Sequence, residues 1–164
     1  MLIDVSYFTT GPRHIQNATL GTMPNPNAVE VNKAIECYIR HNQETFLLRM
    51  LGLTIGQKVY GYIQNEQTDN PDINALCDRL RDSFADYVFY QIVKESGTQA
   101  TITGLVRLKC ANDYISPIRR QVIAWNAMVE KNRIFAYWCR SADCHIRGID
   151  VSDAMLTKIN SVNL

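Results

Sequence analysis

The fold is decided at residues 44–52, which read Glu44-Thr45-Phe46-Leu47-Leu48-Arg49-Met50-Leu51-Gly52. This stretch closes a long pattern in which apolar residues recur at steps of three and four positions, as on one face of a helix. Gly52 lies where a helix C-cap favours a residue that tolerates positive φ. A second helical pattern follows over residues 55–60. The stretch therefore predicts the corner of a helical building block and not an active site.

The composition is that of one globular domain. The chain has 164 residues, of which 46% are hydrophobic and 20% charged, and its formal net charge is +1. Such a chain can bury a core, and its composition excludes wholesale disorder. We expect no secretory signal, because the N-terminus lacks a basic stretch followed by an apolar core. We expect no membrane span, because no apolar run approaches the roughly 20 residues that a span requires. Five scattered cysteines indicate free thiols and synthesis in a reducing compartment.

Residues 1–27 form the first of three predicted regions, an extended N-terminal arm. Glycines and prolines at several positions disfavour a helix, whereas Val5, Tyr7 and Phe8 suit an extended segment. A lone extended segment is unstable until it pairs with a surface. That surface is either the chain's own domain or a neighbouring subunit, and the sequence leaves both possibilities open.

Residues 28–140 form the second region, a helical domain. The periodicity predicts helices at about 28–51, 54–65, 72–96 and 116–140, with Asn27 and Asn70 as N-caps. Asp78, Asp82 and Asp86 lie opposite the apolar stripe of the third helix, where they predict a solvated acidic face or an intersubunit contact. Residues 98–112 favour a short extended or hairpin segment. The predicted fold class is therefore mainly α, a small bundle of about four helices.

Residues 141–164 form the third region, a C-terminal tail. Asp150 or Ser152 can cap a short docking helix through Ile159, and the last residues resemble a frayed end. Cys139, Cys144 and His145 are the one cluster of metal-capable side chains, but the second ligand pair of a zinc site is missing. No positioned base or phosphate-loop spacing accompanies them. We expect no metal, no cofactor and no enzymatic activity.

The best basic patch is the segment 107–120, which contains Arg107, Lys109, Arg119 and Arg120. Residues 101–147 as a whole carry eight basic and three acidic side chains, a balance of +5. One interpretation is a nucleic-acid-binding module, whose affinity would fall with salt. The other is charge matching between subunits, since no motif for specific base recognition accompanies the patch.

The order of several motifs resembles the head-to-tail connector (adaptor) proteins of tailed bacteriophages and prophages. The resemblance spans about residues 1–140 and leaves the tail outside the pattern. It rests on packing motifs, namely Tyr7-Phe8-x2-Gly11, Phe46-Leu47-x2-Met50-Leu51-Gly52 with Val59-Tyr60, the aromatic stretch 84–90, Thr103-Gly104-Leu105-Val106, and Tyr137-Trp138.

The resemblance implies a virion protein, made in the host cytoplasm, that forms a homo-oligomeric ring at the head-to-tail interface. Its implied partners are further copies of the chain, the portal protein, a tail or second adaptor protein, and packaged DNA passing through the ring. A different small virion ring or tail-completion protein is the alternative. The candidate assembly residues come from the arm and the basic patch: Tyr7, Phe8, Arg107, Lys109, Arg119 and Arg120.

Overall fold

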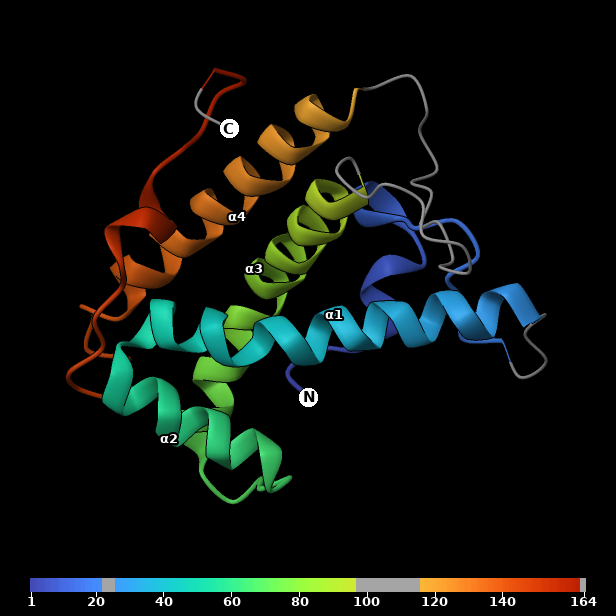
Figure 1. Cartoon of the computed structure of the whole chain (residues 1–164). Helices are drawn as coiled ribbons and strands as arrows, with labels where there is room; N and C mark the ends of the chain where they lie inside the picture. Colours follow the sequence, from blue (N-terminus) through green and yellow to red (C-terminus); the bar gives the residue numbers. More distant parts are fainter. Residues whose placement is uncertain (22–25, 97–115, 163–164) are drawn as a thin grey trace.

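The computed structural model describes residues 1–21, 26–96 and 116–162, and within these ranges the chain is mainly helical (Figure 1). The four α-helices are α1 (Pro26–Leu51), α2 (Leu53–Gln64), α3 (Pro71–Ser96) and α4 (Pro117–Trp138). The described ranges contain no β-strand. This confirms the predicted small bundle of about four helices. The predicted hairpin at 98–112 lies outside the described residues.

Side chains cap the starts of two helices, and the cap at Asn70 is as predicted. The Asn70 side-chain oxygen accepts hydrogen bonds from the backbone N–H groups of Asp72 and Ile73, both at 3.1 Å. Ser116 caps α4 in the same way, with its hydroxyl 3.3 Å from the N–H of Arg119. The predicted cap at Asn27 is wrong, because α1 begins at Pro26. Proline is favoured at the first helical position, where its missing N–H has no intrahelical role.

The corner at Gly52 joins α1 to α2 without a loop. Gly52 has φ +77° and ψ 168°, a backbone conformation that is essentially restricted to glycine. Gly56 permits the two helices to approach closely, because a Cβ atom there would lie 2.9 Å from the carbonyl oxygen of Leu47. The structure therefore confirms the sequence-based prediction of a helix corner.

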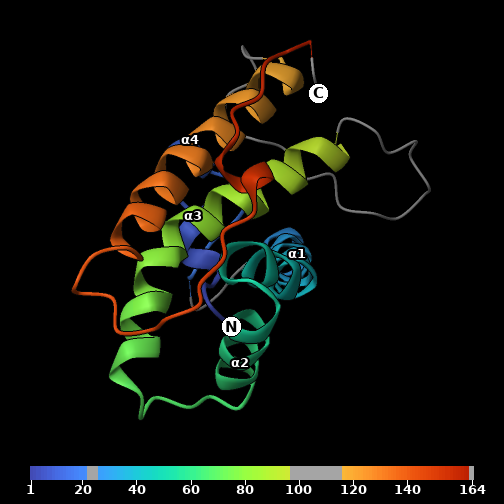
Figure 2. The ribbon, with the colours of Figure 1, turned by 90° about the vertical axis from the view of Figure 1, so that its left-hand side faces the viewer.

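Helix α3 is the centre of the fold. It runs beside α4, and α1 passes across it (Figures 1 and 2). All eight residues from 83 to 90 are buried, so this part of α3 is covered on every side. Aromatic rings join the helices: the ring centroid of Phe46 lies 5.0 Å from that of Phe84, and that of Trp125 lies 4.9 Å from that of Tyr90. The core thus forms where α1, α3 and α4 meet.

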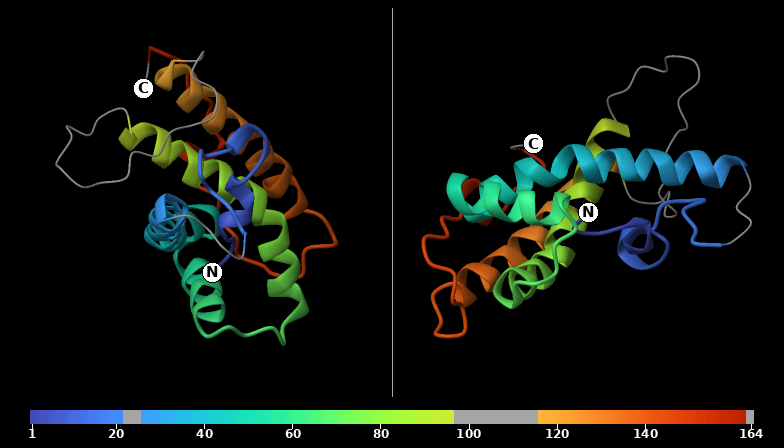
Figure 3. Two further views of the ribbon diagram at one scale, coloured as in Figure 1. Left: turned by 90° about the vertical axis from the view of Figure 1, so that its right-hand side faces the viewer. Right: turned by 90° about the horizontal axis from the view of Figure 1, so that it is seen from below.

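The N-terminal arm folds back onto its own chain (Figure 3). It is not a continuous extended segment, because two 3-10 helices, η1 (Val5–Phe8) and η2 (Gly11–Arg13), interrupt it. Asp4 starts the first of them by accepting a 2.8 Å hydrogen bond from the N–H of Ser6. The apolar side chains of the arm supply six core residues: Leu2, Ile3, Val5, Phe8, Ile15 and Ala18.

The C-terminal tail lies along α4 (Figure 2). The helix predicted through Ile159 is much shorter, since the described part of the tail, up to residue 162, contains only a four-residue 3-10 helix, η3 (Asp153–Leu156), preceded by Ser152. The backbone beyond it forms hydrogen bonds with side chains of α4. None of the helices in the described ranges combines the length and apolar character needed to cross a bilayer.

Candidate functional site

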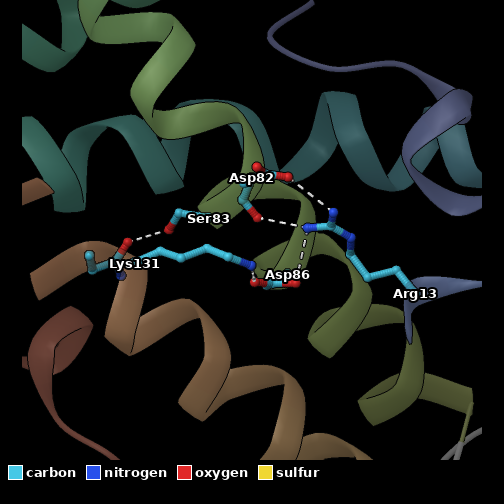
Figure 4. A network of polar contacts seen from close by, with 6 residues as sticks. Arg13, Asp82, Ser83, Asp86 and Lys131 are labelled. Carbon is cyan, nitrogen blue, oxygen red and sulfur yellow. Dashed lines mark hydrogen bonds and ion pairs between the residues drawn. The ribbon is translucent and has the colours of Figure 1, made fainter. Parts of the chain in front are cut away.

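A polar network ties the arm to α3 and α4 (Figure 4). Its centre is Asp86, which is only 6% exposed. Arg13 of the arm donates to one carboxylate oxygen of Asp86 at 3.1 Å, and Lys131 of α4 contacts the other. The second terminal nitrogen of Arg13 lies 3.0 Å from a carboxylate oxygen of Asp82. The burial of Asp86 is thus compensated by two cations from distant segments.

A second branch ties the tail to α3. The Ser83 hydroxyl donates to the side-chain oxygen of Asn132, and the Asn132 amide nitrogen donates to the carbonyl oxygen of Met155 at 2.8 Å. Ser83 and Asn132 are both buried, so neither can exchange these bonds for bonds to water. Asp82 and Ser83 are neighbours in α3, and Lys131 and Asn132 are neighbours in α4. In each helix, adjacent residues thus belong to the branch that binds the arm and to the branch that binds the tail.

The prediction of a solvated or intersubunit acidic face on α3 is wrong for Asp86. Asp78 and Asp82 are exposed, but Asp86 lies one turn further on, where the arm and α4 cover it. The sequence carried a signal for this, because a charged side chain at the edge of a buried helix needs a cation nearby. It did not show which cations would pair with Asp86, since Arg13 and Lys131 lie 73 and 45 residues away from it in the sequence.

The tail is recognised through its backbone. The indole N–H of Trp125 donates to the carbonyl oxygen of Thr157 at 2.9 Å. Asn126 forms a pair of bonds with Ile159: its amide nitrogen donates to the carbonyl oxygen at 3.0 Å, and its oxygen accepts the N–H at 2.9 Å. The bonds from Asn132 and Arg133 complete this set, which we call the tail groove: Trp125, Asn126, Asn132 and Arg133 of α4.

The upstream part of the tail closes the end of α1. The N–H of Ser152 donates to the carbonyl oxygen of Arg49 at 2.9 Å, and the N–H of Asp150 donates to that of Leu51 at 3.3 Å. These carbonyls belong to the last turn of α1, which has no intrahelical donors for them. The tail thus caps the same corner that the sequence identified. A Cβ atom at Gly52 would lie 3.2 Å from that of Asp150.

A cleft of about 630 Å³ lies between the end of α4 and the tail. Burial, followed by the neighbouring Cys144, raises the pKa of the Cys139 thiol to about 12. This thiol is therefore scarcely ionised at neutral pH and is a poor nucleophile. His145 is exposed and lies 3.0 Å from a carboxylate oxygen of Asp72. The described residues contain no group of three or more side chains placed to hold a metal ion.

The outer face of α4 exposes three large apolar side chains. Ile123, Ile134 and Tyr137 are 51%, 68% and 80% exposed. Their spacing of eleven and three residues places them on one face of the helix. We call them the α4 ridge. Beside it lies a groove of about 270 Å³ whose walls are both apolar and charged: Asp78, Arg79, Asp82, Lys131, Ile134 and Phe135.

The structure places the predicted assembly residues in different settings. Phe8 is fully buried in the chain's own core, and Tyr7 is partly buried with the guanidinium of Arg13 5.8 Å from its ring centroid. Arg119 is exposed and Arg120 partly buried in the first turns of α4. Arg107 and Lys109 lie outside the described residues. Sequence reasoning missed the α4 ridge, because periodicity alone does not show which apolar residues of this helix face outward.

Comparison with known proteins does not assign the site. No protein-family model matches the chain, and no curated protein or solved structure matches it either.

Proposed function

We propose that the chain is a non-catalytic structural subunit of a virion, which forms a head-to-tail connector ring. In this role it binds further copies of itself, the portal protein on one side and a tail or second adaptor protein on the other. The α4 ridge is the observation that carries the proposal. The order of motifs that resembles connector proteins supports it from the sequence.

The ridge has the anatomy of a protein interface. Each of its large side chains would gain roughly 25 cal/mol for every Å² of apolar surface that a partner removes from water. Charged residues of α3 and α4 line the groove beside Ile134, and polar groups next to an apolar centre are the usual arrangement of an interface. A contact between this face and a different face of the next copy produces a ring when the rotation from each copy to the next adds up to a full turn.

Because the arm packs on its own chain, we propose that the contact between subunits lies on α4 and not on the arm. Six buried apolar residues make the arm part of the core, so its deletion would remove stability as well as any contact that it forms. Of the two predicted assembly residues in the arm, Phe8 is fully buried and Tyr7 remains partly accessible. A test of assembly should therefore change the ridge, whose side chains contribute little to the core.

Native mass measurement of the purified chain tests the proposal. We expect an assembly of many copies, and we expect the double substitution Ile134→Glu with Tyr137→Glu to shift it to monomers with unchanged helicity. Leu53→Glu is the matched control, because Leu53 is 66% exposed on α2. A monomeric native chain that also fails to bind portal protein would contradict the proposal. Equal loss of assembly in the control would contradict the placement of the contact on α4.

A second candidate function, nucleic-acid binding, is favoured by one observation. Arg119 and Arg120 lie in the first turns of α4, where the helix dipole disfavours cations, and the first turn of this helix contains no acidic residue. An anionic partner would offset the unfavourable interaction of these two cations with the helix dipole. The expected result is binding that falls steeply with salt and is lost on Arg119→Glu with Arg120→Glu. Binding that is insensitive to both changes would exclude this function.

A further inference from the structure

The tail is held as a groove holds a peptide ligand. Four side chains of α4 donate to four successive or near-successive carbonyl oxygens of the tail, and two terminal carbonyls of α1 accept its N–H groups. These bonds are formed with the backbone of the tail and not with its side chains. The tail groove is therefore complete on the helices and requires only an extended segment of chain to fill it.

Few side chains of the tail are locked into the core. Met155 is the fully buried one among the described residues beyond Asp150, whereas Val162 near the end is 90% exposed. The remaining apolar residues of this segment are only partly buried. Opening of this segment withdraws one fully buried side chain, Met155, from the core, so it is a local event compared with opening of the bundle.

The segment that leads into the tail contains a glycine at which the direction of the chain can change. Cys144 is buried and anchors the chain below the end of α4, and the tail begins its contacts with α1 at Asp150. Between them lies Gly148, with φ +82° and open space where a side chain would be. Six residues from Cys144 to Asp150 span roughly 20 Å when extended.

We propose that the tail groove of one copy binds the C-terminal tail of a second copy, so that neighbouring subunits exchange tails. The tail would form the same contacts in the groove of its own chain and in that of a second copy. The two arrangements would differ only in the direction of the segment from Cys144 to Asp150. Assembly raises the local concentration of neighbouring tails, which favours the exchanged form. The inference rests on the proposed self-assembly, because only an assembly keeps a second tail close to the groove.

Crosslinking between two differently tagged full-length variants tests the exchange. Lys158 of the tail contacts Glu130 of α4, and both side chains are about half exposed. One variant carries Glu130→Cys and the other Lys158→Cys, in a background with Cys37, Cys110 and Cys139 changed to serine. A short bismaleimide then joins the two thiols. Tail exchange predicts a covalent dimer that contains both tags.

The control pair combines Glu130→Cys with Lys58→Cys, which places the second thiol on an exposed position of α2. We expect the tail pair to give at least a fivefold higher dimer yield than this control. Asn126→Ala should lower the yield, because it removes both bonds to Ile159. A yield equal to the control, with crosslinking only inside a chain that carries both Glu130→Cys and Lys158→Cys, would overturn the inference.

Native mass separates this outcome from the fate of the proposed function. An assembly without mixed crosslinks would retain the connector proposal and reject tail exchange. Mixed crosslinks from a chain that forms only small oligomers would support the exchange and reject the ring.

Discussion

The N-terminal arm and the C-terminal tail both cross the bundle without α-helices, but the chain holds them in opposite ways. The arm buries six apolar side chains in the core. The described part of the tail, from residue 141 to residue 162, buries two, Cys144 and Met155. The tail is held instead by hydrogen bonds between its backbone and the helices. One end of the chain thus belongs to the core, whereas the other is bound to its surface.

This difference predicts different dynamics. Burial of a large apolar side chain contributes roughly 1.5–3 kcal/mol, and its loss affects the whole cooperative unit. A net hydrogen bond contributes about 0.5–1.5 kcal/mol, and partly exposed bonds open locally. We therefore expect the arm to unfold with the bundle and the tail to open before it.

Phe8→Ala should have the largest effect. It creates a cavity in the core, where Phe8 is fully buried, and we expect a loss of about 3–5 kcal/mol in the free energy of unfolding. Urea denaturation followed by circular dichroism measures this. Leu20→Ala is the control in the same arm, because Leu20 is 66% exposed. A small effect of Phe8→Ala, similar to the control, would show that the arm is not part of the core.

The sequence predicted the arm better than the tail for a physical reason. The apolar residues of the arm are themselves the contact, so Val5 and Phe8 were visible as residues that need a surface. The contact of the tail is its backbone, which has the same chemistry in every sequence. The side chains that bind the tail, among them Asn132, belong to α4, and no local pattern in that helix marks them as partners of the tail. The helices followed from periodicity and capping residues, because these signals are local.

The candidate site was less predictable than the fold. Asp86 is paired by residues far away in the sequence, and no local pattern specifies such partners. The α4 ridge was missed because an exposed apolar residue looks like a core residue until the orientation of the helix is known. The structure thus supplied the relative placement of segments, which periodicity does not contain.

Asn132→Ala should have the next largest effect and should act on the tail. The change leaves the Ser83 hydroxyl and the Met155 carbonyl without their partner in a buried setting, at a cost of about 2–3 kcal/mol. Hydrogen exchange of the Ser152 and Ile159 amides should accelerate more than that of the Ile15 amide in the arm. Asn126→Ala should cost less, because water can reach its partly buried site. Equal acceleration in arm and tail would contradict the distinction between them.

Gly52→Ala should cost about 1–2 kcal/mol, because an L residue at this positive φ is strained and its Cβ meets Asp150. The substitution affects both the core and the tail, since it disturbs the corner between α1 and α2 and the contact of that corner with Asp150. Gly61→Ala is the matched control within α2, where a Cβ has open space and alanine favours the helix. Thermal denaturation should show opposite signs for the two changes. A stabilising Gly52→Ala would contradict the role given to this corner.

Acid should have the smallest effect of these changes at the tail, where it acts through the ion pair of Glu130 with Lys158. The hydrogen bond from Lys158 lowers the pKa of the Glu130 carboxyl below its usual value, so the folded state favours the charged form. This contribution is present above the unfolded pKa of about 4.3 and is lost as the pH falls through the lower folded value. The NMR shift of the Ile159 amide should follow this titration, whereas that of the Ile15 amide should not. Glu130→Gln should remove the dependence, because the glutamine carries no titrating proton. A dependence that persists in Glu130→Gln would assign the titration to another group and would leave the tail without an acid-sensitive contact at this ion pair.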